Sequence, residues 1–555
     1  MSASAFIKAF DSMALNRGFT ENGANCHLST ESPLLDLFFE AVRDLSDAQL
    51  DTLITAVIST HDKDSILHLF VMCFQTRDCR GGKGERTLAF KFFVRLFDTY
   101  PEVCLATVHL FPEFGSWKDM LQLLTLTTND MLQNKVLDLY STQLKADYTE
   151  ATKPVDAASA VPYHPKLSLA AKYSPSEGKE FATAHPDLFK KFLEKLFPKC
   201  PSEKGLQQRL YRKMKTAINA KLATIEVMMC DDRFEDINMS SVPSVAMKKY
   251  RKAFLNEDLK SGEIRHPGNE GRMTARDNLL EAAASTDPKK SIKGGQLTPA
   301  DIAKQFMRPE YSGSAQRLSD AEKQVLFAQW NDMRSKVAGK GRPVVPVADV
   351  SGSMAGVPME NAVALSILLS EVTIDAFRDR VITFHEKPTW VDLSKATTLE
   401  QKVHTVQAAP WGMSTNMHAV FLLIVDVVRK NRLTADQVPD LAIFTDMQFD
   451  TAFGAGLMTH LEMVTKLFHN LGMELHGVPM ERPRITFWNL RATTGAPATG
   501  NAKNVMMLSG FSQSLLKYVL EDTPFEPEPT PLETMMKVLN DERYNIVREI
   551  VDPLL

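Results

Sequence analysis

The amino-acid sequence predicts a multidomain protein of the α plus α/β class, in which a helical part precedes a doubly wound parallel sheet. The chain has 555 residues, more than the roughly 100–200 that one domain usually takes. Over residues 33–145, apolar side chains recur at helical spacing in successive short segments. After residue 341, apolar runs alternate with helical segments, which is the pattern of a parallel sheet with helices on its faces.

The helical part is expected to span residues 31–340, after an N-terminal extension of residues 1–30. Helices of about 10–14 residues joined by short turns favour a HEAT-like solenoid of helix pairs. No clean period is visible, so any repeats are degenerate. The expected helices lie at 33–45, 51–59, 65–74, 87–97, 117–124, 189–197, 206–229, 245–254 and 320–336.

The α/β part is expected to span residues 341–522, and residues 523–555 form a proline-acidic linker and a closing helix. Pro346 lies in the first expected strand, where its missing N–H would be tolerated at a bulge. The expected strands are 344–348, 381–384, 441–444, 475–478, 485–489 and 505–508, and the expected helices are 359–372, 416–429, 455–471 and 512–520.

Composition is that of an ordinary soluble globular protein, with 44% apolar and 24% charged residues. No apolar run approaches the roughly 18–20 residues of a membrane span, so no membrane association is expected. The six cysteines form no C-x-x-C pair, which favours an intracellular protein in the cytoplasm, with the nucleus as a second location. No nucleophile–base pair or nucleotide-binding loop is visible, so the sequence predicts that the protein is not an enzyme.

Charge is distributed unevenly along the chain. Residues 341–555 carry 18 basic against 25 acidic side chains, a net charge of −7, whereas residues 1–340 carry 46 against 43, a net charge of +3. This asymmetry suggests an anionic partner for the first part.

Three polar groups follow apolar runs in the α/β part and predict a metal site. Asp349, Ser351 and Ser353 form an Asp-x-Ser-x-Ser motif after the first strand, Thr415 precedes a helical run, and Asp446 ends a third apolar run. Carboxylate and hydroxyl oxygens suit Mg²⁺. The carboxyl ends of parallel strands converge on one crevice, so these residues could meet at one ion. The alternative is that each group is an ordinary turn or N-cap.

Two basic segments are candidates for RNA binding. Cations suit phosphates, glycines allow close approach of a ligand, and an aromatic ring can stack on a base. The alternatives are an inter-helix loop with local ion pairs for the first segment, and a solvated helix face with Tyr250 as a core anchor for the second. The candidate residues are Arg77, Arg80, Lys83 and Arg86 in the first segment, and Lys248, Lys249, Tyr250, Arg251 and Lys252 in the second.

The metal motif resembles the metal-ion-dependent adhesion site of von Willebrand factor A (vWA) domains. The resemblance implies that Ser351, Ser353 and Thr415 bind Mg²⁺ or another divalent cation directly, while Asp349 and Asp446 hold its water ligands. It also implies an open coordination position that an acidic residue of a partner protein can fill.

The whole arrangement is similar to the TROVE-plus-vWA architecture of Ro ribonucleoprotein autoantigens, which implies a ring of helical repeats that binds RNA. Residues 80–86, 242–250, 349–354 and 444–450 also resemble an uncharacterised family of eukaryotic and viral proteins, known only as a domain of unknown function. The sequence thus favours a non-enzymatic RNA-binding protein of Ro-like architecture. The alternative is a protein-interaction scaffold whose metal site binds an acidic residue of its partner.

Overall fold

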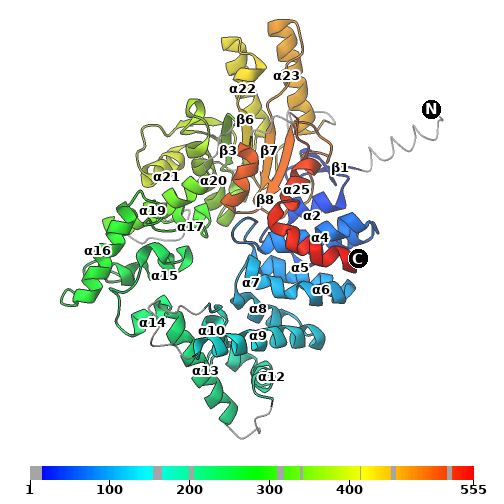
Figure 1. The fold of residues 1–555 in the computed structure, drawn as a ribbon. Helices are drawn as coiled ribbons and strands as arrows, with labels where there is room; N and C mark the ends of the chain where they lie inside the picture. The colour runs from blue at the N-terminus through cyan, green and yellow to red at the C-terminus, as the bar shows by residue number, and fades with distance from the viewer. Residues whose placement is uncertain are drawn as a thin grey trace.

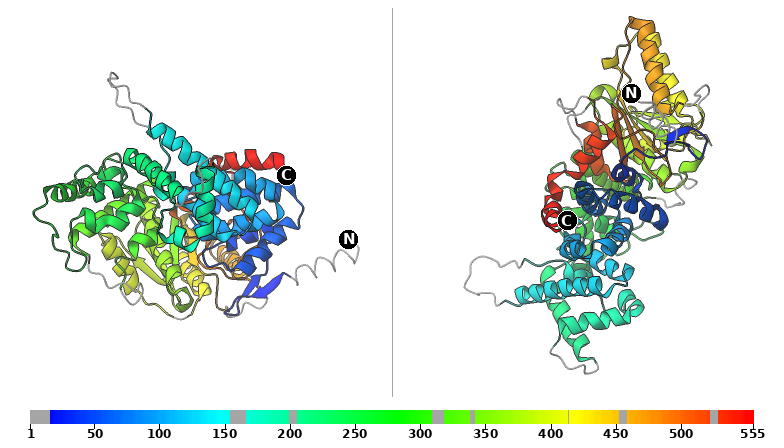
Figure 2. Two further views of the ribbon diagram at one scale, coloured as in Figure 1. Left: turned by 90° about the horizontal axis from the view of Figure 1, so that it is seen from below. Right: turned by 90° about the vertical axis from the view of Figure 1, so that its right-hand side faces the viewer.

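The computed structural model describes residues 16–153, 166–198, 205–308, 318–337, 342–412, 414–451, 458–521 and 528–555. It shows a mostly helical N-terminal part followed by a six-stranded mixed sheet with flanking helices. Figures 1 and 2 show that the sheet lies towards one end of the molecule and that α9–α13 lie at the other.

The helical part leaves the sheet along one arm and returns along another. Figure 1 shows this path as a colour change from blue beside the sheet, through cyan at the far end, to green beside the sheet again. The first arm contains α2 (Pro33–Glu40), α3 (Asp47–Ile58), α4 (Lys63–Arg77), α5 (Arg86–Thr99), α6 (Pro101–Thr107), α7 (Phe111–Phe114), α8 (Trp117–Leu126) and α9 (Asp130–Ala151).

The second arm has a separate apolar core around α15, α16 and α19, to which Met247, Phe254, Leu279 and Val325 contribute. Apolar side chains at helical spacing produce this core, as expected for amphipathic helices. The helices after α9 are α10 (Ala170–Tyr173), α11 (Glu180–Ala184), α12 (Pro186–Leu196), α13 (Leu206–Leu222), α14 (Ile225–Cys230), α15 (Ser244–Phe254), α16 (Glu270–Ala284), α17 (Pro299–Ala303) and α19 (Asp320–Val337).

The sheet has the strand order β5-β4-β3-β6-β7-β8, and all of its neighbouring pairs are parallel except β4–β5. Its strands are β3 (Val344–Asp349), β4 (Arg380–Phe384), β5 (Thr389–Asp392), β6 (Asp440–Thr445), β7 (Ile485–Asn489) and β8 (Val505–Ser509). The helices of this part are α20 (Val357–Val372), α21 (Leu399–Ala408), α22 (Met417–Asn431), α23 (His460–His476) and α24 (Leu516–Leu520).

Helices cover both faces of the sheet. Val345 and Val347 of β3 share a core with α22 and α23, whereas the alternating Val344 and Ala348 share a core with α20. Successive side chains of a strand point to opposite faces, so a strand buried on both sides is apolar throughout. Pro346 stays within β3 without a bulge: it pairs with Ala442 of β6, and pairing with β4 begins only at Val347.

The structure corrects two sequence expectations in this part. The sheet is mixed rather than wholly parallel, because the edge strand β5 runs antiparallel to β4. The stretch 475–478, expected as a strand, is the end of α23 and the turn after it. Gly477 caps that helix with φ +73°, a conformation that suits glycine.

Both ends of the described chain return to distant parts of the molecule. The hairpin of β1 (Arg17–Phe19) and β2 (Asn25–His27) bridges to Ala496 and Asp450 in the α/β part. At the other end, α25 (Pro531–Leu539) and α26 (Asn545–Val551) share a core with α4. Arg543 of this C-terminal segment forms an ion pair with the buried Asp78.

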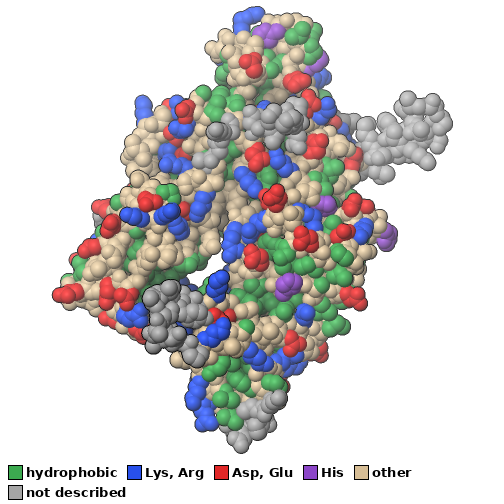
Figure 3. Space-filling view, in the orientation of Figure 1, with side chains coloured by type: hydrophobic (Ala, Val, Ile, Leu, Met, Phe, Trp, Pro, Cys, Tyr) green, Lys and Arg blue, Asp and Glu red, His purple; other side chains and the backbone are tan. Residues whose placement is uncertain are grey.

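The two arms meet the α/β part on either side of one short turn before α24. Ser514 Oγ donates a hydrogen bond to the carbonyl of Arg80 (3.2 Å), and Gln513 Nε2 donates to the carbonyl of Gly295 (3.1 Å). The two arms and the α/β part thus form a closed path. Figure 3, in the orientation of Figure 1, shows an opening near the middle of the molecule with Lys and Arg side chains along its rim.

Candidate metal centre

The carboxyl ends of β3 and β6 lie at the point where the strand order reverses. These strands are neighbours, while β4 and β7 lie on opposite sides of them, so the connections leave in opposite directions. In open α/β sheets, ligands bind in the crevice at such a switch point. Asp349 ends β3 and Asp446 directly follows β6, and both carboxylates are fully buried there.

The carboxylate of Asp349 is fixed by two hydrogen bonds. Its Oδ1 accepts from the backbone N–H of Ser351 (3.0 Å), and its Oδ2 accepts from the hydroxyl of Thr445 (2.6 Å). The first bond tightens the loop after β3, and the second joins that loop to β6. Asp349 therefore organises the surrounding chain.

The two serine hydroxyls of the motif lie side by side. Ser351 Oγ and Ser353 Oγ are 3.1 Å apart and share a hydrogen bond. Arg491, in the loop after β7, donates from Nη1 to the carbonyl of Ser353 (3.1 Å) and lies 3.9 Å from Asp446 Oδ2. Ser351 is buried and Ser353 is half-buried, so the site opens to solvent on the Ser353 side.

Thr415 is attached to the same edge of the sheet. Its N–H donates to Asp450 Oδ2 (2.7 Å), and its carbonyl accepts from the N–H of Asp450 (3.0 Å). The following residue, Asn416, donates its N–H to the carbonyl of His385, which directly follows β4. Asn416 also caps α22 through its side chain. The loop before α22 is thus held between the ends of β4 and β6.

Among the described residues, two oxygen atoms of the predicted metal ligands are buried with no hydrogen-bond partner: Thr415 Oγ1 and Asp446 Oδ2. Leaving a buried polar group unsatisfied costs about 1–3 kcal/mol, and more when the group is charged. The set of hydroxyls and carboxylates matches the oxygen ligands that Mg²⁺ prefers. These residues therefore fit a hard divalent cation.

Electrostatics at the site also favour a cation. Burial, and then the negative charge of Asp446, raise the pKa of Asp349 to about 7. Burial raises the pKa of Asp446 as well, although the nearby hydroxyl of Ser353 opposes the shift. A divalent ion is the largest charge in such a site and reverses these effects. Among the described residues, no group of three or more His, Cys, Asp or Glu could hold a metal, and the candidate centre has only two carboxylates.

The N-terminal hairpin supports the loop that follows Asp446. Thr20 Oγ1 donates to the carbonyl of Phe449 (2.7 Å), and Asn22 Nδ2 donates to that of Gln448 (2.7 Å). Gln448 in turn donates its N–H to Asp446 Oδ1 (3.1 Å). Within this loop Met447 adopts φ +64°, an uncommon conformation for a residue with a side chain. No sequence pattern indicated the contacts of the hairpin, which join residues more than 400 positions apart.

The first basic segment is mostly internal, so only some of its predicted RNA-binding cations are accessible to a ligand. Arg77 is buried and pairs with Asp119 (2.6 Å), with which Arg86 also pairs (3.3 Å). Lys83 is buried too. Arg80 is exposed, and its Nη1 donates to the carbonyl of Glu113 (2.6 Å). Only Arg80 and the half-buried Arg86 of these four remain accessible to a ligand.

Lys83 joins the helical part to the sheet. Its ammonium group donates to the carbonyls of Phe38 (2.6 Å) and Ala41 (2.9 Å) at the end of α2, and to Ser509 Oγ (2.7 Å) at the end of β8. Burial lowers its pKa to about 7, against the opposing charge of Glu85. This side chain is a structural connection rather than a phosphate contact.

The second basic segment lies on α15 and is also largely paired. Arg251 is buried against Glu322 (2.9 Å), and Lys252 donates to the carbonyl of Leu259 (2.8 Å). Lys248 pairs with Asp301 (2.5 Å).

Lys249 is the exposed cation of this segment, and it lies 4.8 Å from the centre of the Tyr250 ring. Tyr250 is partly buried and packs against the core of the second arm. This position agrees with the alternative interpretation, in which Tyr250 anchors the helix to a core.

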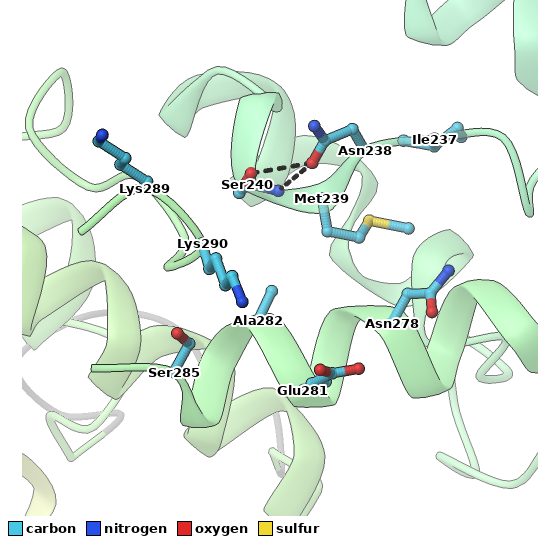
Figure 4. Close-up of a pocket in the computed structure, with 10 residues that line it drawn as sticks. All are labelled: Ile237, Asn238, Met239, Ser240, Asn278, Glu281, Ala282, Ser285, Lys289 and Lys290. Carbon is cyan, nitrogen blue, oxygen red and sulfur yellow. Dashed lines mark hydrogen bonds between the residues drawn. The ribbon is translucent and has the colours of Figure 1, made fainter. Parts of the chain in front are cut away.

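A separate hollow of about 400 Å³ lies between the turn before α15 and the end of α16. Figure 4 shows Lys290 extending over Ala282 of α16, whereas Lys289 points away from it. Asn238 accepts hydrogen bonds from the N–H and hydroxyl of Ser240 on the opposite wall. With two lysines and Glu281 on its lining, this hollow carries charges of both signs and contains none of the predicted site residues.

Comparisons with known proteins place the chain in a family. Residues 344–554 match a family described as Domain of unknown function (DUF7788), and residues 20–137 and 130–264 match Domain of unknown function (DUF2828). The "Uncharacterized protein L728" of Acanthamoeba polyphaga mimivirus is 31% identical over 532 residues, covering 92% of this chain and 86% of that protein. The chain belongs to the same family as this viral protein. Its predicted resemblance to an uncharacterised family is confirmed.

The matched ranges agree with the fold. The match to DUF7788 begins at β3 and extends through α26, so it includes the sheet together with the C-terminal helices. The match to DUF2828 begins within the N-terminal hairpin, at Thr20. In the described part of the chain, no helix is both long enough and apolar enough to cross a membrane.

Proposed function

We propose that the protein binds Mg²⁺ at the carboxyl ends of β3 and β6 and uses the ion to bind an acidic residue of a partner protein. The α/β part is proposed to be vWA-like. Numbered along the chain, its six strands follow the order 3-2-1-4-5-6, with ligand residues at the switch point, and this supports the assignment.

The observation that carries this proposal is the pair of unsatisfied oxygens, Thr415 Oγ1 and Asp446 Oδ2, at the same edge of the sheet as two adjacent serine hydroxyls. Ser351, Ser353 and Thr415 would bind the ion directly, and Asp349 and Asp446 would bind through water. The ion would supply a positive charge able to accept a partner's carboxylate on the more exposed Ser353 side. This role is binding rather than catalysis, so the protein is proposed not to be an enzyme.

RNA binding of a Ro-like kind is the second candidate. The observation in its favour is the opening between the helical arms, with basic side chains along its rim (Figure 3). Arg80 and Lys249 remain exposed for such contacts. Three other candidate cations are buried and therefore not available to RNA: Arg77, Lys83 and Arg251. For this reason we place the metal-dependent function first.

Isothermal titration of the full chain with MgCl₂ tests the proposal. Wild-type protein is expected to bind one ion, and Thr415→Val, which removes one hydroxyl without changing side-chain volume, is expected to weaken binding at least tenfold. Thr465→Val serves as the control, because Thr465 is an exposed residue of α23. Absence of Mg²⁺ binding by the wild type at millimolar concentrations would rule the site out.

Partner class is tested with the same proteins and a library of Asp- and Glu-containing peptides. Binding that disappears with EDTA and in Thr415→Val supports the metal-dependent interaction. A titration with single-stranded and hairpin RNA over a range of salt concentrations tests the second candidate. RNA binding that weakens steeply with salt but persists in EDTA would favour RNA over a protein partner.

A further inference from the structure

The junction where both helical arms meet the α/β part contains a small hollow of about 150 Å³. Four segments far apart in the sequence line it: the loop after α4, the loop before α17, the end of α19, and the turn before α24 together with the start of that helix. Ligand sites occur preferentially at such junctions between structural units. The lining residues are Arg80, Gly81, Gly295, Lys336, Val337, Gln513, Ser514 and Lys517.

The charge of this lining is of one sign. Arg80, Lys336 and Lys517 are basic, and none of the described residues that line the hollow is acidic. The first arm, the second arm and the α/β part each contribute one cation. The cations are also partly exposed, so a solute can reach them.

Each cation keeps donors that its protein contacts do not use. Lys336 donates to Asp332 (2.6 Å) and Lys517 to Asp541 (2.8 Å), but an ammonium group has three donors. Arg80 donates from Nη1 to the carbonyl of Glu113, and a guanidinium has five donors in a planar fork. The carboxylates hold the lysines in place and leave N–H groups for a ligand.

A glycine makes room for one of these cations. A side-chain carbon on Gly295 would lie 2.6 Å from Lys336 Nζ, closer than carbon and nitrogen can approach. Gly295 also accepts the hydrogen bond from Gln513 that joins the second arm to the α/β part. The position of the Lys336 ammonium group therefore depends on the absence of a side chain at residue 295.

We propose that this hollow is a binding site for a phosphate group. Arg and Lys are the side chains that bind phosphate oxygens best, and the volume suits a group of that size rather than a whole nucleotide. A bound phosphate would contact cations from both arms and from the α/β part at once. It would thereby connect the three units around the closure of the chain, independently of the cation site at β3 and β6.

The proposal is tested with full-length protein and inorganic phosphate, by isothermal titration at constant ionic strength with chloride as the background anion. Wild type is expected to bind phosphate, and Arg80→Gln to weaken binding about tenfold or more, the effect of losing one charge-assisted contact. Arg212→Gln removes the same charge from an exposed position on α13 and is expected to bind as the wild type does.

Gly295→Ala provides a second variant that keeps every charge but displaces Lys336, and it is also expected to weaken binding. A thermal unfolding curve of each variant shows that it is folded. Failure of the wild type to bind phosphate at millimolar concentrations would overturn the proposal. Equal binding by wild type, Arg80→Gln and Gly295→Ala would also overturn it, because the anion would then occupy another place.

The source of the phosphate is distinguished with short oligoribonucleotides that carry either a 5′-phosphate or a 5′-hydroxyl. Tighter binding of the 5′-phosphorylated oligonucleotide than of inorganic phosphate, lost in Arg80→Gln, assigns the hollow to a nucleic-acid end. Equal affinity for inorganic phosphate and for the phosphorylated end assigns it to a small phosphate-bearing ligand. Both results support the site.

Discussion

The buried carboxylate of Asp349 makes the stability of the cation-free protein depend on pH. Its pKa is raised from 3.8 to about 7, first by burial and second by the charge of Asp446. The folded state therefore binds this proton more tightly than the unfolded state does. The free energy of unfolding is expected to fall as pH rises from about 4 to above 7, because folding then requires burial of an uncompensated charge.

Asp349→Asn removes this titration with little change in shape. The amide Oδ1 can still accept the N–H of Ser351, and the Thr445 hydroxyl can rotate to accept from the new Nδ2. About three pKa units at 1.36 kcal/mol each give at most about 4 kcal/mol. In EDTA, the variant is thus expected to be more stable than the wild type at pH 8 by up to that amount.

Urea unfolding of both proteins in EDTA measures this difference. Between pH 5 and pH 8 the stability of the variant relative to the wild type is expected to rise by about 2–3 kcal/mol. Asp375→Asn, at a highly exposed carboxylate of the same part, serves as the control and is expected to show no such rise. A difference that does not change with pH, or a variant less stable than the wild type at pH 8, would refute the reasoning. With excess MgCl₂ the order is expected to reverse, since only the wild type gains stability from the ion.

Three further changes have expected outcomes. Lys83→Met leaves the buried Ala41 carbonyl and the Ser509 hydroxyl without the donor that Lys83 supplies, whereas the Phe38 carbonyl keeps its bond from Ser509. The free energy of unfolding in urea is therefore expected to fall by about 2–4 kcal/mol, against about 1 kcal/mol for Ser509→Ala. Thr20→Val breaks the bond from the hairpin to Phe449 and is expected to weaken Mg²⁺ binding about tenfold in calorimetric titrations, because the support of metal ligands affects affinity to this degree. Tyr544→Ala empties a buried position between the C-terminal segment and the first arm, and is expected to cost about 3–5 kcal/mol of stability in thermal unfolding.

Each of these outcomes has a result that would contradict it. A cost for Lys83→Met no greater than that for Ser509→Ala would show that the ammonium group does not connect α2 to β8. Unchanged Mg²⁺ affinity in Thr20→Val would separate the hairpin from the metal site. Unfolding of Tyr544→Ala at the wild-type temperature would mean that the C-terminal helices contribute little to the core of the first arm.

Much of the sheet was predictable because its strands are buried on both faces and therefore apolar throughout. Runs such as 441–444 and 485–489 match β6 and β7 closely. The edge strand β5 escaped prediction because an edge needs burial on one face only, and its Trp390 is half exposed. The helix end at 475–478 resembled a strand because the apolar residues Leu475 and Val478 lie on either side of the capping Gly477.

The neighbouring positions of Asp349 and Asp446 were predictable because each lies at the carboxyl end of a strand, and such ends converge by topology. The basic segments were not, since sequence shows the sign of a charge but not its partner. Arg77 and Asp119 lie 42 positions apart, and Lys83 finds its acceptors on α2 and β8. Only the folded chain shows that these cations are used internally.

The contact between the C-terminal helices and α4 has a consequence for the order in which the protein is made. Residues 545–551 leave the ribosome more than 450 positions after α4, which at about 5–20 residues per second is a delay of roughly half a minute to a minute and a half. During that time the apolar face of α4 that receives Tyr544, Val547 and Val551 lacks its cover. The first arm can complete its core only after residues 544–551 have been made, so a nascent chain of this protein needs protection of that face until they emerge.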